Sequence, residues 1–159
     1  MEFFVTRQGW LEAAVFSGGE PTAHPALADA MSEIKAAGFK IGLHSSGVYP
    51  ENFAAVLPLA DWVGLDIKAP LDARYDRIAG ARGAAEKTRE SLKLLLASGV
   101  PHQLRTTVHP KLLSSGDLAD LQRDLAACKA GPSILQPFRP QGCLDEELVA
   151  TGDRQLLSS

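Results

Sequence analysis

The sequence predicts an α/β fold with five parallel strands, either an open doubly wound sheet or part of a (β/α) barrel. Three observations support this. Short apolar runs alternate with helical patterns, each run ends in polar or glycine-rich residues, and 159 residues are enough for one hydrophobic core. Because connections between parallel strands are almost always right-handed crossovers, the strands should lie side by side in one sheet.

Each element has its own local signal. Helical stripes are bounded by turn residues: Pro25 suits a first helical turn, and Gly38 and Gly99 suit helix ends, where a left-handed residue is needed. The apolar runs predict strands at 13–17, 40–44, 62–66, 102–108 and 133–138. The stripes predict helices at 24–37, 49–56, 84–98 and 117–129, with a helical turn at 145–150 and the end of a further helix at 3–5.

Composition excludes several classes of protein. The net charge is −3, so we expect no broad basic surface for nucleic acid. The apolar runs are far shorter than the roughly 20 residues of a membrane helix, so no membrane partner is expected. The N-terminus has no cleavage-site pattern, and we predict a cytoplasmic protein.

Metal-ligating residues are sparse. The two cysteines, Cys128 and Cys143, form no C-x-x-C pair, which excludes a zinc ribbon, and a conventional iron–sulfur cluster needs about three or four thiolates. We interpret both as structural thiols. His44 and His109 lack a paired ligand spacing and are read as lone polar or structural histidines. No metal site is predicted.

Polar residues gather where the predicted strands end, which is where α/β folds carry their chemistry. Gly18 and Gly19 would let the backbone approach a ligand, with the Glu20 carboxylate beside them for an ammonium group. A plain strand-to-helix turn with Glu20 in solvent is the alternative. Asp66 and Lys68 share one face of a strand and could form an acid–base pair at the mouth of a barrel. A solvated ion pair or a Schiff-base lysine are the other interpretations.

Together these strand ends resemble one family. Residues 15–22 are similar to the GGEP stretch of radical S-adenosylmethionine (SAM) enzymes, and residues 66–68 to the D-x-K stretch of glycyl-radical-enzyme activases. Residues 43–47 resemble the strand-end T-N-G of that group, and 105–108 and 135–139 its last two strands. Over about residues 1–145 the order is most similar to activating proteins of anaerobic ribonucleoside-triphosphate reductase.

The resemblance implies a partial (β/α) barrel of the radical SAM type over residues 1–150, with a tail at 151–159. It implies S-adenosyl-L-methionine as cofactor. Ser17, Gly18, Gly19 and Glu20 would hold its amino group, Ser45, Asp66 and Lys68 its amino-acid end, and Arg105 and Arg139 would face the same pocket. No catalytic residue is singled out.

Family enzymes cleave this cofactor reductively with a [4Fe–4S] cluster, and the 5′-deoxyadenosyl radical removes a hydrogen atom from a glycine of a partner. The implied partners are anaerobic ribonucleotide reductase and an electron donor such as flavodoxin.

The sequence departs from the family at its start. The C-x-x-x-C-x-x-C cluster loop and the strand before it would precede residue 7 and are absent, so the strand at 13–17 should be a sheet edge. The sequence could start at an internal methionine of a longer protein, be a short gene product, or receive its cluster from another chain.

The sequence therefore predicts a glycyl-radical activating protein that is inactive as these 159 residues. The alternatives are a non-catalytic remnant that binds SAM or a partner, and a lysine-dependent aldolase-like barrel.

Overall fold

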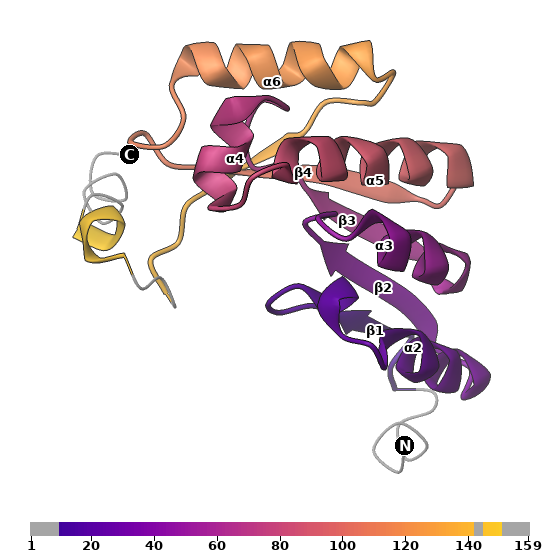
Figure 1. The fold of residues 1–159 in the computed structure, drawn as a ribbon. Coiled ribbons are helices and arrows are strands. Elements are labelled where there is room, and N and C mark those ends of the chain that lie inside the picture. Colours follow the sequence, from indigo (N-terminus) through magenta and orange to yellow (C-terminus); the bar gives the residue numbers. More distant parts are fainter. Residues whose placement is uncertain (1–9, 142–144, 151–159) are drawn as a thin grey trace.

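The computed structural model describes residues 10–141 and 145–150 (Figure 1). Its centre is a five-stranded sheet in the order β1-β2-β3-β4-β5, in which every neighbouring pair is parallel. The strands are β1 (Ala13–Phe16), β2 (Lys40–Ser45), β3 (Trp62–Asp66), β4 (His102–Val108) and β5 (Ile134–Pro137). The five predicted parallel strands are thereby confirmed.

Helices connect consecutive strands. They are η1 (Pro21–Ala23), α2 (Leu27–Ala36), α3 (Pro50–Val56), η2 (Leu57–Leu59), α4 (Ala73–Ala79), α5 (Ala84–Ser98) and α6 (Ser115–Ala127), and residues 146–150 are also helical. Helix α5 has its predicted bounds. Helix α6 starts before the predicted residue 117 because Ser114 and Asp117 form a capping box. Helix α4 was not predicted; Asp72 caps its start and the left-handed Gly80 ends it.

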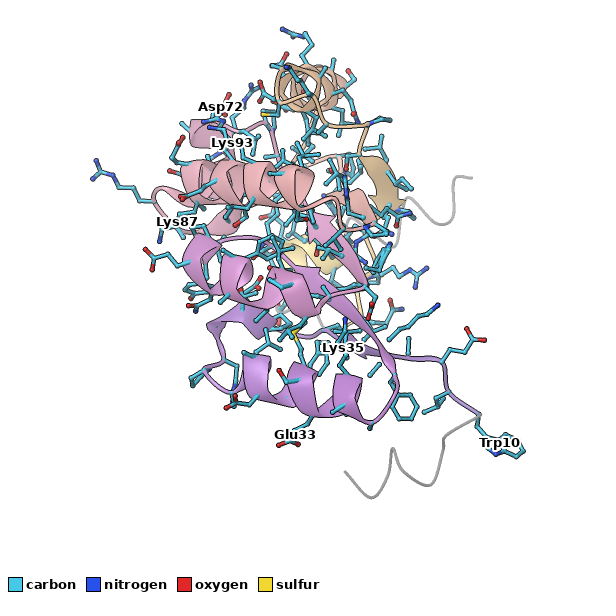
Figure 2. All side chains as sticks on the ribbon, turned by 90° about the vertical axis from the view of Figure 1, so that its right-hand side faces the viewer. Trp10, Glu33, Lys35, Asp72, Lys87 and Lys93 are labelled. Carbon is cyan, nitrogen blue, oxygen red and sulfur yellow. The ribbon has the colours of Figure 1, made fainter. Side chains whose placement is uncertain are left out.

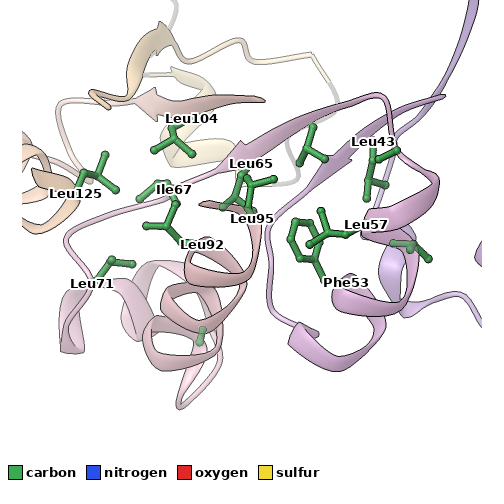
Figure 3. Packing of buried hydrophobic residues seen from close by; sticks show 14 of the residues in the cluster. Leu43, Phe53, Leu57, Leu65, Ile67, Leu71, Leu92, Leu95, Leu104 and Leu125 are labelled. Atoms are coloured by element: carbon green, nitrogen blue, oxygen red, sulfur yellow. The ribbon is translucent and has the colours of Figure 1, made fainter. Parts of the chain in front are cut away.

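The hydrophobic core lies between one face of the sheet and its helices. Figure 3 shows Leu65 and Ile67 close to Leu92 and Leu95 of α5, and all four side chains are fully buried. Burying each such side chain stabilises the fold by roughly 1.5–3 kcal/mol. The alternation along the strands therefore fixes which face turns toward the helices.

The other face of the sheet carries polar and aromatic residues. Cross-strand register places His44 of β2 beside Gly64, and Asp66 of β3 beside Arg105 of β4. Helices α2, α3, α5 and α6 follow one side of the curved sheet (Figure 1). A doubly wound sheet would have helices on both faces, so this is a partial (β/α) barrel.

Both ends of the sheet are open within the described residues. β1 lies at one edge, as predicted, and Val15 is 54% exposed. β5 lies at the other edge, where Ile134 and Leu135 are each 48% exposed. The helix expected at residues 3–5 and the tail at 151–159 lie outside the described residues, so the division at residue 150 stays a prediction. None of the described helices is long and apolar enough to cross a membrane.

Candidate functional site

A pocket of about 500 Å³ lies at the carboxyl ends of β1 to β4. It brings together eight of the nine residues singled out in the sequence: Ser17, Gly18, Gly19, Glu20, Ser45, Asp66, Lys68 and Arg105. The sequence analysis missed other lining residues, among them His44, Ser46, Tyr49, Arg82 and Lys87. Ser45 and Asp66 end β2 and β3, Arg105 lies within β4, and the Ser17–Glu20 stretch follows β1, so the common direction of the strands brings these residues together.

The glycine pair leaves the backbone open to the pocket. Gly18 and Gly19 have φ values of 89° and 57°, in the left-handed region that glycine adopts at least cost. A Cβ built at either position would meet nothing within 4 Å. Glycine is thus required here by conformation, and the space beside its peptide groups is free for a ligand.

The Glu20 carboxylate joins the loop after β1 to the loop after β2. One oxygen accepts hydrogen bonds from Thr22 N (3.2 Å), Thr22 Oγ1 (2.5 Å) and Ser45 Oγ (2.7 Å). The other accepts from Ser46 N (2.7 Å) and Ser46 Oγ (2.5 Å). Burial acts to raise the pKa of Glu20, but the bonds from Ser46, Thr22 and Ser45 outweigh it, so the pKa lies below its ordinary value. Glu20 is therefore an anion whose acceptor sites are already in use.

Side chains of helix α5 form hydrogen bonds with the loop after β2. Ser91 Oγ donates to Gly47 O at 2.7 Å, and Thr88 Oγ1 lies 3.1 Å from both Ser46 O and the Tyr75 hydroxyl. That hydroxyl also reaches Asp66 O at 3.3 Å, and burial raises the pKa of Tyr75 to about 12. These contacts fix the loops after β2 and β3 to one helix.

Asp66 pairs with its cross-strand neighbour Arg105 rather than with Lys68. Arg105 Nε and Nη2 donate to Asp66 Oδ1 at 2.9 and 2.7 Å. No described donor reaches the other carboxylate oxygen, Oδ2. Lys68 is exposed and forms no ion pair with any described residue. The predicted acid–base pair is thus replaced by an Asp66–Arg105 pair and a separate lysine cation.

His44 extends this pair across the open face of the sheet. Arg105 Nη1 lies 3.2 and 3.3 Å from the two ring nitrogens of His44, and the Trp62 ring centroid is 5.4 Å from the His44 ring centroid. The indole lies over Gly64, where a Cβ would come within 2.8 Å of it. Burial and the Arg105 charge lower the pKa of His44, against the opposing effect of Asp66, so the ring is neutral at pH 7.

Arg139 lies apart from this site. It lines a second pocket of about 580 Å³ with Thr107, Phe138 and Gln141. We had expected Arg139 to face the first pocket, but it does not line it. The reason is that β5 ends at Pro137, so the chain has left the sheet by residue 139.

His109 packs in the interior of the described chain. It is fully buried, its Nε2 lies 3.2 Å from Leu148 O, and its ring meets Phe138 edge to face at 5.0 Å. The described residues contain no group of three or more side chains placed to hold a metal ion.

Comparison with known proteins gives one family match and one curated relative. The model of the radical SAM superfamily matches residues 1–115. PqqA peptide cyclase from Gluconobacter oxydans (strain 621H) is 31% identical over 116 residues, which are 70% of this chain and 32% of that protein. The chain therefore spans about a third of the length of this relative.

Solved structures share the fold. A domain of pyruvate-formate lyase-activating enzyme from Bacteroides vulgatus ATCC 8482 has a TM-score of 0.66 at 16% identity, over 92% of this chain and 93% of that one. TYW1 with a lysine-pyruvate adduct bound has a TM-score of 0.66, and archaeal TYW1 one of 0.64, each at 16% identity over 99% of this chain and 58% of that one. At this identity the likeness shows the fold alone.

Proposed function

This chain belongs to the radical SAM superfamily, and we propose that it is the S-adenosylmethionine-binding core of an activating protein that generates a glycyl radical on anaerobic ribonucleotide reductase. The observation that carries the proposal is the pocket that unites the Gly18–Gly19–Glu20, Ser45 and Asp66–Lys68 stretches. The order of motifs along the sequence supports the activase assignment within the superfamily.

The pocket residues suit the amino-acid end of S-adenosylmethionine. A volume of about 500 Å³ is in the range of small-molecule sites. Lys68 supplies a cation without an ion-pair partner in the described chain, which suits a carboxylate. Oδ2 of Asp66 and the open peptide groups of Gly18 and Gly19 supply acceptors for an ammonium group.

Glu20 has a different role from the one its motif first suggested. Because five donors already use its two oxygens, it positions Ser45, Ser46 and the glycine loop rather than binding an ammonium group directly. Arg105 is likewise engaged by Asp66. We therefore expect Lys68 to be the residue that pairs with the cofactor carboxylate.

Bound S-adenosylmethionine would supply the hydrogen-abstracting chemistry, while these residues bind and orient it. The family's [4Fe–4S] cluster does not fit the thiols available here. Cys128 caps the end of α6, and Cys143, outside the described residues, is the only other cysteine of the sequence. A conventional cluster needs about three or four thiolates, so these residues alone do not hold one.

Binding of the cofactor tests the first part of the proposal. Isothermal titration calorimetry of the chain with S-adenosylmethionine should show saturable binding. Lys68→Ala should weaken this binding, whereas Lys93→Ala, on the surface of α5, should leave it unchanged. Absence of binding to the wild-type chain would overturn the proposal.

Activity tests the second part. After anaerobic incubation with iron, sulfide and dithionite, we expect no 5′-deoxyadenosine from these 159 residues. A version preceded by a C-x-x-x-C-x-x-C segment should form it and, with reduced flavodoxin and anaerobic ribonucleotide reductase, give a glycyl-radical signal in electron paramagnetic resonance. A signal with pyruvate-formate lyase instead would contradict the assigned partner. Binding without cleavage in that version would favour the non-catalytic remnant.

The lysine-dependent alternative has weaker support. A Schiff-base lysine is activated by burial or by a neighbouring cation, whereas Lys68 is exposed. Borohydride trapping of pyruvate on Lys68 would revive this alternative.

A further inference from the structure

The lining of the first pocket includes several cations. Arg82, in the turn between α4 and α5, and Lys87, in the second turn of α5, line the pocket together with Lys68 and Arg105. Its two lining carboxylates are already engaged, Glu20 by hydroxyl and amide donors and Asp66 by Arg105. Lys68, Arg82 and Lys87 thus form a positive rim on a chain whose net charge is −3.

The nearby acidic side chains bond mainly to other groups, although the Asp76 charge also interacts with Arg82 over a distance longer than an ion pair. The Asp76 carboxylate accepts hydrogen bonds from Gly83 N at 2.7 Å and Ala85 N at 2.9 Å. Glu86 forms an ion pair with Arg89 at 2.8 Å. Arg82 and Lys87 are both exposed and form no ion pair with a described residue.

We propose that Arg82 and Lys87 bind an acidic segment of the polypeptide substrate beside the cofactor pocket. The inference rests on the proposed function, in which Lys68 pairs with the cofactor carboxylate and a polypeptide carries the reacting residue. Two exposed cations then remain for the substrate.

The local geometry favours an acidic polypeptide over a phosphate. A phosphate site at a helix start uses free backbone N–H groups, but Gly83 N and Ala85 N already donate to Asp76. An extended chain can reach both cations on their flexible stems and contact Tyr49, which is 43% exposed at the same pocket. Charge complementarity of this kind mainly sets encounter rate and specificity.

The test uses the full chain and a fluorescein-labelled peptide of ten glutamates, followed by fluorescence anisotropy. Binding should be measurable in 20 mM NaCl and much weaker in 200 mM NaCl, because salt screens exposed charges. The double variant Arg82→Glu/Lys87→Glu should bind about tenfold more weakly or worse, and Lys87→Gln should fall between it and the wild type.

Lys93→Glu is the control: it reverses one charge on the same helix as Lys87, which is half the charge change of the double variant. Lys93 does not line the pocket, and in the view of Figure 2 it lies on the side of α5 toward Asp72, with Lys87 on the other side. Its affinity for the peptide should stay within about twofold of the wild type. An equal loss in Lys93→Glu, or no binding in 20 mM NaCl, would overturn the proposal.

Two further measurements separate the possible failures. Tripolyphosphate that displaces the peptide at equal or lower charge concentration would indicate a phosphate site and overturn the polypeptide assignment. Titration of the same variants with S-adenosylmethionine tests the cofactor site independently. Binding of the peptide without binding of the cofactor would support the acidic-segment site and contradict the proposed function.

Discussion

The two sides of the sheet's carboxyl end are built differently. At β1 to β3 the loops are cross-linked: Glu20 joins the first two, and Thr88 and Tyr75 connect the second and third to the helix layer. At β5 the strand ends at Pro137 as an exposed edge, and Arg139 lines a separate pocket. The cross-linked side contains the first pocket.

This difference has an energetic meaning. A loop that is already fixed loses little conformational entropy when a ligand binds, so more of the interaction energy appears as affinity. Loops fixed only by their own turns lose more. We therefore expect substitutions in the cross-links to affect stability and cofactor binding together, and substitutions at β5 to affect neither strongly.

Removal of the Glu20 carboxylate should have the largest effect. Glu20→Ala leaves the Ser45 and Ser46 donors without their acceptor, and we expect the free energy of unfolding to fall by about 3 kcal/mol. Urea denaturation followed by circular dichroism measures the change. Glu33→Ala, at an exposed position of α2 labelled in Figure 2, should stay within about 0.5 kcal/mol. Equal effects of the two substitutions would contradict the role of Glu20 as a cross-link.

Gly47 tests the contact between the second loop and α5. Its φ is 71°, and an added Cβ would lie 2.9 Å from Ser91 Cβ, so Gly47→Ala should lower the free energy of unfolding by about 2 kcal/mol or more. Gly99 is a matched control, because it has the same φ of 71° but open space around it. Gly99→Ala should cost about 1 kcal/mol, from backbone strain alone. If the two variants unfold at the same denaturant concentration, the loop and helix are less tightly packed than the structure shows.

Substitutions of Lys68 and Arg139 compare how much each side of the sheet contributes to S-adenosylmethionine binding. Lys68→Ala should weaken S-adenosylmethionine binding about tenfold, since it removes a charge-assisted contact worth about 1.5 kcal/mol. Arg139→Ala should change it less than about twofold, because this side chain faces the second pocket. Calorimetric titration measures the affinity for S-adenosylmethionine, and the unfolding midpoint should be unchanged in both variants. A tenfold loss in Arg139→Ala would restore this residue to the cofactor site.

Local sequence signals predicted the five strands and most helices, whereas α4 was missed although Asp72 and Gly80 mark its two ends. Helix α4 is only seven residues long, and Arg74 ties it to α6 through Asp117 and Asp120 at 2.7 and 2.8 Å. No signal within the α4 segment reveals those partners.

The site follows the same rule. The strand-end motifs identified eight pocket residues, but His44 became visible only through Arg105, which lies two strands away in the sheet. Its position on the strand face that Asp66 and Arg105 share was the one available clue. Arg139 was assigned to the pocket because sequence order does not show where β5 ends.

The acid sensitivity of the cross-linked side should be a smaller effect, and its sign follows from Glu20. The pKa of Glu20 is lower in the folded chain than the ordinary value of 4.5, so its contribution to stability is present above pH 4.5 and is lost as the pH falls through the folded pKa. Wild type should therefore lose stability between about pH 5 and pH 3. Glu20→Gln, which has no charge to titrate, should be less stable than wild type at pH 7 and should approach the stability of wild type at pH 3.

Other carboxylates also contribute to the pH dependence of wild-type stability, because their pKa values are lowered too: Asp61, Asp72, Asp76 and Asp117. The decisive quantity is thus the difference between the two proteins measured by urea denaturation at each pH. A difference that stays constant from pH 7 to pH 3 would mean that Glu20 stabilises the loops without its charge.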